Sequence, residues 1–285
     1  MLGAGPADGG EDVEHSGPYP PPADALELLP PQSMALVLDR RGSSVWKLGT
    51  DRGGYAVKVG YPTKTHSWTA LAPAREAEIL RTITGELILS GEWERGTWGA
   101  QPWRKGKSLY ELWAPLREGV ARSSRALAQS RACAAAVARL HAKGWAHGDI
   151  QPSHFILDGT LTHLIDVALA HGGEVSEAYD FPYRGCLVHY EAPEISRRVL
   201  EGGTATPSYA SDVYALGASL LLSATGKRHV RYPDEASRTI QREAVAKGPG
   251  APVAVTGKLG EIIHAMLERD PRNRPTISDV MESLS

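Results

Sequence analysis

The sequence predicts an α+β protein in which a small antiparallel sheet with one helix precedes a larger, mainly helical part. Three observations support this fold class. Short apolar runs separated by Gly-bearing turns occupy much of residues 34–102. Longer helical patterns with Ser or Pro near their starts dominate residues 103–285. A chain of 285 residues is also long enough for one large domain or two lobes, and it can bury a substantial core.

The composition is that of an ordinary soluble globular protein, with 42% hydrophobic and 22% charged residues. Lys and Arg number 31 against 33 Asp and Glu, so charge gives no strong attraction to nucleic acid or to an anionic membrane. No apolar run is long enough to span a bilayer, and the start lacks a signal-peptide pattern. Cys133 and Cys186 lack metal-ligand spacing and fit a reducing compartment. We expect a cytoplasmic protein, without nucleic-acid or membrane partners, from a bacterial genome rich in Ala, Arg, Gly and Pro codons.

The first segment, residues 1–33, is rich in Gly, Pro and acidic residues and poor in large apolar ones. Burial of so few apolar groups cannot offset the entropy lost on ordering. We therefore expect this segment to be disordered or loosely docked. Its short apolar piece at residues 26–29 is the part that can pack on the folded domain.

The next part of the chain has the pattern of an antiparallel meander. Strands are predicted at residues 35–38, 45–48 and 55–59, with two more at 87–89 and 98–101. Alternation along the third strand places Lys58 on the face opposite Val57 and Val59. A lysine within an apolar strand favours an anionic partner, although an exposed lysine on an edge strand is the alternative.

A helix after this strand supplies a candidate partner for Lys58. Pro73 suits the first turn of a helix that continues through residues 75–80. Glu76 lies three and four residues before two apolar residues and so shares their inward face, whereas Glu78 does not. We expect Glu76 to pair with Lys58; a solvent-facing glutamate is the alternative.

Two aspartates in the middle of the chain carry the chemistry. Asp149 lies in the polar stretch 147–154 before a short apolar run, and Asp166 follows the next apolar run. A loop between buried strands can aim both carboxylates at one site. Phosphoryl transfer uses such a pair, one carboxylate accepting the proton of the attacking hydroxyl and the other holding magnesium on the nucleotide phosphates. The alternative is that both aspartates only cap loops.

These residues belong to an ordered series that resembles the motifs of the protein kinase superfamily. The series comprises Lys58, Glu76, His147-Gly148-Asp149, Asp166-Val167-Ala168, Ala192-Pro193-Glu194, Asp212 and Arg274. The resemblance implies a bilobal protein-kinase-like fold, with an N-lobe at residues 34–102 and a C-lobe at 103–285. It also implies that Asp212 ties down the catalytic loop and that Arg274 pairs with Glu194.

The resemblance further implies ATP and Mg2+ as cofactors. Asp149, Lys58 and Glu76 would form the catalytic set, and Asp166 with His154 would hold the metal. Lys58, Arg40, Ser43 and His154 would contact the nucleotide. Gln101 and Trp103, at and after the end of a strand where the family has its hinge between lobes, would lie beside the adenine.

Several positions depart from the family pattern. The phosphate loop has Leu38, Arg40 and Ser43 where glycines are expected, so close approach of its backbone to phosphate is harder. His154 replaces the second metal ligand, and imidazole is a poor ligand for a hard cation such as magnesium. Further along, Gly148 and Gln151 replace a catalytic-loop arginine and lysine. The resemblance implies that this arginine reads an activation-loop phosphate, so loop phosphorylation is not the expected switch. Ala168 replaces a glycine, which predicts a stiffer metal loop.

Three functions follow from this mixture. The first is an ATP-dependent phosphotransferase acting on a Ser- or Thr-type hydroxyl of a protein or peptide substrate. The second is a pseudokinase that binds nucleotide or acts as a scaffold. The third is a small-molecule kinase, because the pattern at residues 147–149 also resembles that of aminoglycoside and choline phosphotransferases. The combination of this pattern with protein kinase motifs also suggests a finer hypothesis, a kinase that modifies a peptide in natural-product biosynthesis.

Overall fold

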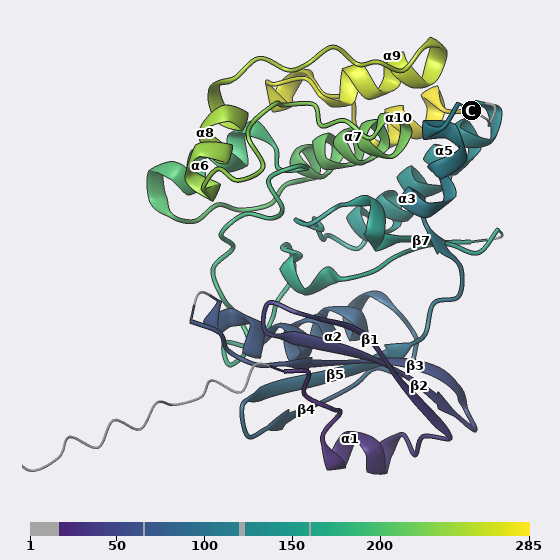
Figure 1. Ribbon diagram of the computed structural model, residues 1–285, viewed down its shortest axis with the longest axis vertical. Coiled ribbons are helices and arrows are strands. Elements are labelled where there is room, and N and C mark those ends of the chain that lie inside the picture. Colours follow the sequence, from purple (N-terminus) through teal and green to yellow (C-terminus); the bar gives the residue numbers. More distant parts are fainter. Residues whose placement is uncertain (1–16, 65, 120–122, 160) are drawn as a thin grey trace, which may run out of the picture.

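The two lobes predicted from the sequence are present in the computed structural model, which describes residues 17–64, 66–119, 123–159 and 161–285. A sheet lobe and a larger helical lobe are stacked on one another (Figure 1). This arrangement confirms the α+β, protein-kinase-like fold class. None of the helices within these ranges is long and apolar enough to cross a bilayer.

The sheet of the first lobe is antiparallel throughout, with strand order β1-β2-β3-β5-β4. Its strands are β1 Ser33–Arg40, β2 Ser43–Thr50, β3 Gly53–Gly60, β4 Leu89–Trp93 and β5 Gly96–Pro102. The first hairpin turns within two residues, Arg41 and Gly42, both with positive φ of 51° and 81°. This geometry matches the right-handed twist of the strands on either side.

One predicted strand is displaced. We expected a strand at residues 87–89, but β4 begins only at Leu89. Ile88 is instead buried against helix α2, in a cluster with Ala77 and Leu80. Its carbonyl accepts a hydrogen bond from Arg81 Nε at 3.2 Å. Because Ile88 packs against α2, the chain joins the sheet only at Leu89.

Helix α2, Ala72–Ile83, packs against the sheet and brings Glu76 towards β3. Pro73 lies in its first turn, as predicted. The helix comes so close to β5 that a Cβ added at Gly99 would lie 2.6 Å from the Pro73 carbonyl oxygen. A glycine at this point therefore sets the distance between helix and sheet.

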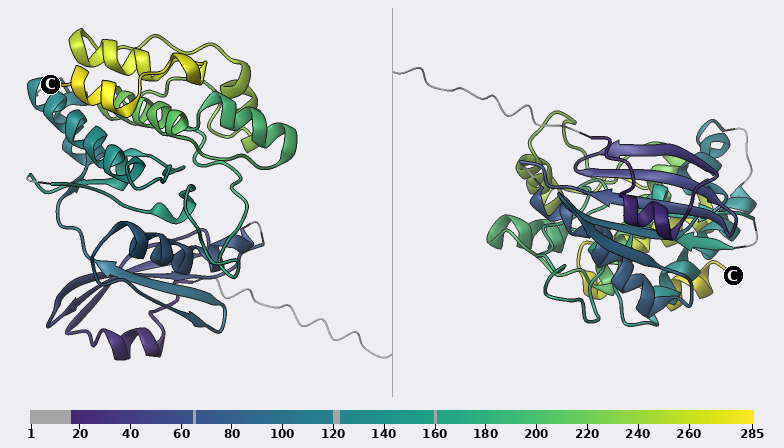
Figure 2. Two further views of the ribbon diagram at one scale, coloured as in Figure 1. Left: turned by 180° about the vertical axis from the view of Figure 1, so that it is seen from behind. Right: turned by 90° about the horizontal axis from the view of Figure 1, so that it is seen from below.

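The segment before β1 departs from the expectation of a disordered or loosely docked chain over residues 17–32; residues 1–16 lie outside the described residues. Helix α1, Ala23–Leu28, lies across the outer face of the sheet (Figure 2). Ala25 and Leu29 are fully buried there. Asp24 Oδ2 accepts a hydrogen bond from Trp98 Nε1 at 3.0 Å. Because the outer face of this sheet is apolar, even a short segment gains enough burial to dock.

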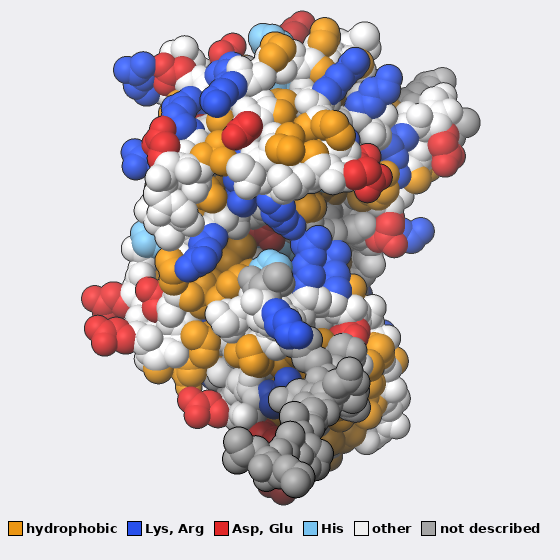
Figure 3. All heavy atoms as spheres, turned by 60° about the vertical axis from the view of Figure 1, so that its left-hand side comes forward, with side chains coloured by type: hydrophobic (Ala, Val, Ile, Leu, Met, Phe, Trp, Pro, Cys, Tyr) orange, Lys and Arg blue, Asp and Glu red, His pale blue; other side chains and the backbone are white. Residues whose placement is uncertain are grey.

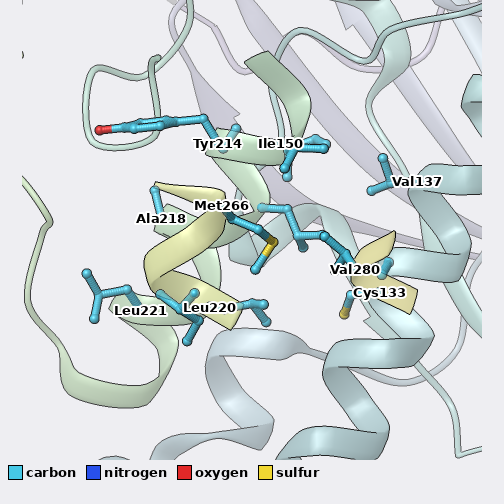
Figure 4. Packing of buried hydrophobic residues seen from close by; sticks show 14 of the residues in the cluster. Cys133, Val137, Ile150, Tyr214, Ala218, Leu220, Leu221, Met266 and Val280 are labelled. Carbon is cyan, nitrogen blue, oxygen red and sulfur yellow. The ribbon is translucent and has the colours of Figure 1, made fainter. Parts of the chain in front are cut away.

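The second lobe is built around helix α7, which is buried along most of its length. The helices of this lobe are α3 Leu109–Leu112, α4 Ala114–Arg117, α5 Ser123–His141, α6 Pro193–Gly202, α7 Tyr209–Thr225, α8 Arg238–Lys247, α9 Gly257–Met266 and α10 Ile277–Ser283. Figure 4 shows the core where residues of α5, α7, α9 and α10 meet. Gly217 lets α7 approach Met266 of α9, since an added Cβ would lie 2.8 Å from that side chain.

A buried ion pair joins two distant parts of this lobe, as the sequence predicted. Arg274 donates to both carboxylate oxygens of Glu194, with each nitrogen–oxygen distance 2.7 Å. The Arg274 side chain is completely buried and also donates to the Ala210 carbonyl at 2.9 Å. Such a two-pronged pair fixes the start of α6 against the chain that precedes α10.

Candidate active site

Asp212, in the first turn of α7, binds the backbone of the loop that carries Asp149. The backbone N–H groups of His147 and Gly148 donate to the Asp212 carboxylate at 2.6 and 3.0 Å, and His141 Nε2 lies 2.9 Å from it. The carboxylate is buried and fully used by these contacts. The structure therefore confirms that Asp212 ties down the backbone before Asp149.

Gly148 has a backbone conformation that a larger residue would strain. Its φ is +75°, and an added Cβ would lie 2.8 Å from both the Leu169 carbonyl oxygen and the Pro207 ring. The Tyr183 hydroxyl donates to the Gly148 carbonyl at 2.7 Å. The position thus contributes a tightly packed piece of backbone. It has no side chain that could contact the activation segment, the chain between Asp166 and Glu194 in the family pattern.

Asp149 is a largely buried carboxylate whose two oxygens differ in their contacts. Gln151 Nε2 donates to its Oδ2 at 3.1 Å. Within the part of the chain that the structure describes, its Oδ1 has no hydrogen-bond partner. Burial, and then the nearby charge of Asp166, raise the pKa of Asp149 to about 7. An acceptor with this pKa and a free oxygen suits a general base.

Lys58 lies between two carboxylates. Its Nζ is 2.6 Å from Glu76 Oε2, which is the predicted ion pair, and 2.9 Å from Asp166 Oδ1. Burial acts against the charge of Lys58, but the two carboxylates more than compensate and raise its pKa. Gln101 Nε2 donates to Glu76 Oε1 at 3.3 Å and so helps to orient this glutamate.

Asp166 follows strand β8, Thr162–Leu164, and has a left-handed backbone with φ of 66°. Burial acts to raise the pKa of its carboxyl, but the charge of Lys58 holds that pKa well below its usual range. We refer to Lys58, Glu76, Asp149, His154 and Asp166 as the interlobe site. The surface where the two lobes meet carries basic side chains and a histidine (Figure 3).

The metal loop, in which Ala168 replaces the glycine of the family pattern, places its positive φ at another residue. Ala168 is part of the helical turn Val167–Leu169, and the positive φ falls on Asp166 instead. Arg75, next to Glu76 on α2, donates to the carbonyls of Ala168 and Ala170, the latter at 2.9 Å. No sequence pattern indicates this role, because a buried arginine on a helix has the same pattern as an exposed one.

His154 links the two aspartates. Its Nδ1 is 2.8 Å from the Asp149 carbonyl oxygen, and its Nε2 is 3.4 Å from Asp166 Oδ2. The side chain is 7% exposed. His147 serves the same backbone from the other side, because its Nε2–H donates to the Ile165 carbonyl at 3.0 Å.

The predicted phosphate contacts lie on the face of the sheet that Lys58 occupies. Val45 is the direct partner of Lys58 across the β2–β3 ladder, and directly opposed residues point to the same face. Alternation from Val45 places Ser43 on this face, and Ser43 pairs with Arg40. The hairpin tip is anchored, since the Tyr61 N–H donates to the Gly42 carbonyl at 2.9 Å.

The predicted adenine contacts are used in other ways. The Gln101 amide is buried and bonded to Glu76, so its side chain orients the ion pair. The Trp103 N–H donates to the Gly54 carbonyl at 2.8 Å, and Lys47 Nζ lies 4.9 Å from its ring centroid. That N–H is therefore not available to the adenine of a nucleotide, which would have to contact other groups of residues 102–104.

The described residues supply part of the coordination of a divalent cation. No group of three or more His, Cys, Asp or Glu side chains in the described ranges is arranged to hold a metal by itself. Asp166 and His154 supply two adjacent donor atoms. A cation bound there would complete its coordination with phosphate oxygens and water, as is usual for nucleotide sites.

Comparison with known proteins agrees with this geometry. Residues 98–284 match the protein kinase domain family. The chain is 26% identical over 216 residues to the probable serine/threonine-protein kinase PkwA of Thermomonospora curvata, covering 74% of this chain and 28% of that protein. It is 32% identical over 151 residues to mitogen-activated protein kinase kinase kinase 8 of Rattus norvegicus, covering 50% and 30%.

A third relative is the ovarian-specific serine/threonine-protein kinase Lok of Drosophila melanogaster. The identity is 29% over 154 residues, which cover 52% of this chain and 31% of that protein. The matched part of this chain thus spans less than a third of the length of each of these three relatives.

Proposed function

This chain belongs to the protein kinase family, and from that membership we propose that it transfers the terminal phosphate of ATP to a Ser- or Thr-type hydroxyl of a protein or peptide. The observation that carries the proposal is the buried Oδ1 of Asp149, which has no hydrogen-bond partner among the described residues. It lies in the same site as a lysine that is already paired with Glu76 and Asp166.

The reaction requires one proton acceptor. As the acceptor oxygen forms its bond to the terminal phosphorus, the bond from that phosphorus to the bridging oxygen breaks, and ADP leaves with the electron pair. The hydroxyl proton passes to Asp149 Oδ1. Gln151 holds the other oxygen at 3.1 Å and so fixes the direction of the free one.

Lys58 is the nucleotide clamp in this proposal. Its ammonium is held between Glu76 and Asp166 at 2.6 and 2.9 Å, which places a positive charge where nucleotide phosphates are bound in this family. A divalent cation on Asp166 and His154, when bound, supplies charge neutralisation on those phosphates. Arg40 and Ser43 on the same face of the hairpin are the remaining proposed phosphate contacts.

The test is transfer of labelled phosphate from ATP to a library of Ser- and Thr-containing peptides. Asp149→Asn is expected to lower transfer by about 100-fold or more while nucleotide binding is retained, because a general base contributes about that much. Lys58→Ala is expected to weaken nucleotide binding itself, as a thermal melt with ATP would show. Undiminished transfer by Asp149→Asn would refute the assigned base.

A pseudokinase is the second candidate, and specific features favour it. The hairpin tip is anchored by Tyr61 and lacks the spaced glycines of the family, and His154 replaces a metal ligand. This candidate predicts that wild type binds nucleotide and transfers no phosphate to peptides, sugars or amino alcohols. Transfer to a sugar or amino alcohol alone would instead identify a small-molecule kinase.

The peptide acceptor can be narrowed by one further step. The hybrid sequence at residues 147–149, within a chain that has the protein kinase motifs, is the feature behind a role in peptide natural-product biosynthesis. Precursor peptides encoded beside this gene are the acceptors to test first. Transfer to unrelated proteins but to none of these peptides would refute the narrower proposal.

A further inference from the structure

We propose that His154 makes the interlobe site select Mn2+ over Mg2+ as the nucleotide-bound cation. This inference rests on the proposed function, because the cation binds with the nucleotide. It concerns the second donor atom of the site, which is a ring nitrogen in this chain.

The hydrogen bond on one side of the ring defines what the other side offers. A backbone carbonyl can only accept, so His154 Nδ1, 2.8 Å from the Asp149 carbonyl oxygen, must carry the hydrogen. In the neutral imidazole the lone pair is then on Nε2. This nitrogen faces Asp166 Oδ2 at 3.4 Å. Lys58 already pairs with the other oxygen of Asp166, Oδ1, at 2.9 Å, so the facing acceptors Nε2 and Oδ2 are left as the donor atoms for a second cation.

The separation of these two atoms suits adjacent ligands of one ion. Two donors at right angles, each about 2.1 Å from a cation, lie roughly 3 Å apart. At that bond length the observed 3.4 Å corresponds to an angle of about 108° between the two bonds, which is wider than the right angle of an ideal octahedron. Nitrogen and oxygen are therefore already placed at a spacing that one ion can bridge.

The backbone makes this placement rigid. His154 ends the turn Pro152–His154, and the next residue begins β7, Phe155–Leu157. Strands β7 and β8 are paired, and the Ile165 N–H donates to the His154 carbonyl at 2.9 Å. A ligand pair held this way exists before the metal arrives, so little ordering is needed on binding.

The chemistry of the ring nitrogen decides between cations. Mg2+ prefers oxygen ligands and gives up its water reluctantly, so an imidazole is a poor substitute for an amide oxygen. Mn2+ shares the preference of Mg2+ for carboxylate, phosphate and water oxygens, but as the first member of the first-row transition series it also forms bonds to imidazole nitrogen, although weaker ones than Fe2+, Ni2+, Cu2+ or Zn2+. One nitrogen among oxygens thus shifts the preference from Mg2+ towards Mn2+.

The experiment measures metal binding, independently of phosphate transfer. The full chain is titrated with Mn2+ in the presence of ADP, followed by the paramagnetic resonance of the ion, and then with Mg2+ in competition. His154→Asn, which replaces the ring with an oxygen donor, is expected to lower the Mn2+ to Mg2+ affinity ratio, because it removes the nitrogen ligand. His163→Asn is the matched control, because that histidine is on β8 outside the site.

A spectroscopic test needs no variant and so covers the case in which His154→Asn fails to fold. In wild type labelled with 15N-histidine, pulsed paramagnetic resonance should detect one directly bound nitrogen on Mn2+. Nucleotide-dependent Mn2+ binding without this coupling, and with the same affinity ratio in His154→Asn, would refute the inference and leave the proposed function standing. Failure to bind any metal–nucleotide complex would overturn both.

Discussion

Replacing Asp149 with Asn should stabilise the unliganded protein above pH 7. The pKa of this carboxyl is raised from 3.8 to about 7 in the folded protein. Between these values the folded state keeps a proton that the unfolded chain has released, so the free energy of unfolding falls as the pH rises from about 4 to about 7. At pH 8 the whole penalty is present, and Asn removes it.

The size of this effect follows from the burial of the group. The difference between 3.8 and about 7 corresponds to about 4 kcal/mol if it is fully realised. The side chain is 17% exposed and can recruit water, so we expect about 2 kcal/mol. In a chain of this length that raises the Tm by about 4 to 8 °C.

Asp166 provides the control, because the same substitution there should have the opposite sign. Lys58 holds the pKa of the Asp166 carboxyl low, so the charged form stabilises the fold at any pH above about 4 and that stability is lost only as the pH falls below it. Asp166→Asn removes one of two partners of Lys58. Because 39% of the Asp166 side chain is exposed, screening limits the loss to about 1 kcal/mol.

The assay is thermal and urea unfolding of wild type and the two variants between pH 5 and pH 8.5, in EDTA and without nucleotide. Asp149→Asn should gain stability over wild type as the pH rises, and Asp166→Asn should lose it at every pH in this range. An Asp149→Asn variant that melts with wild type at pH 8, or whose gain is the same at pH 5, would refute the reasoning.

Three further outcomes are expected. The transfer rate of wild type should fall as the pH decreases below about 7, since Asp149 must be ionised to accept a proton; a rate independent of pH from 5 to 8 would exclude it as the base. Arg274→Met should cost about 3 to 5 kcal/mol in urea unfolding because it leaves Glu194 unpaired, and Glu194→Gln in the same chain should recover part of that loss. Arg75→Leu should lower kcat for peptide transfer through displacement of the metal loop, with the fold retained by circular dichroism; unchanged kcat would show that the clamp is dispensable.

The parts of the fold that sequence predicted are those set by local pattern and fixed spacing. Alternation and Gly-bearing turns were enough for β1, β2 and β3. The inward face of α2 was enough to choose Glu76 over Glu78 as the partner of Lys58. Each depends on residues within one turn or one strand, where a single periodicity decides which side chains point inward.

The parts that sequence missed depend on surfaces that only the assembled fold creates. The apolar piece at residues 26–29 indicated that this segment could pack on the domain, but the ordering of the chain around it as α1 depends on the apolar outside of the sheet. Arg75 is a clamp only because α2 approaches the metal loop. In each case the partner is distant in sequence, and the local pattern of the residue has several equally good interpretations.

The activation segment, between Asp166 and Glu194, is held in position by contacts within the protein. Gly148 stands where the family pattern has an arginine that contacts a phosphate on this segment. Its packing against Leu169 leaves no room for a side chain. Other groups hold the same stretch. Arg75 binds its beginning, the Tyr183 hydroxyl binds the Gly148 carbonyl, and Arg242 pairs with the fully buried Glu191 at 2.8 Å. Ion pairs of this kind are formed as the chain folds and need no added charge. The described contacts therefore put the segment against the interlobe site in the unmodified protein.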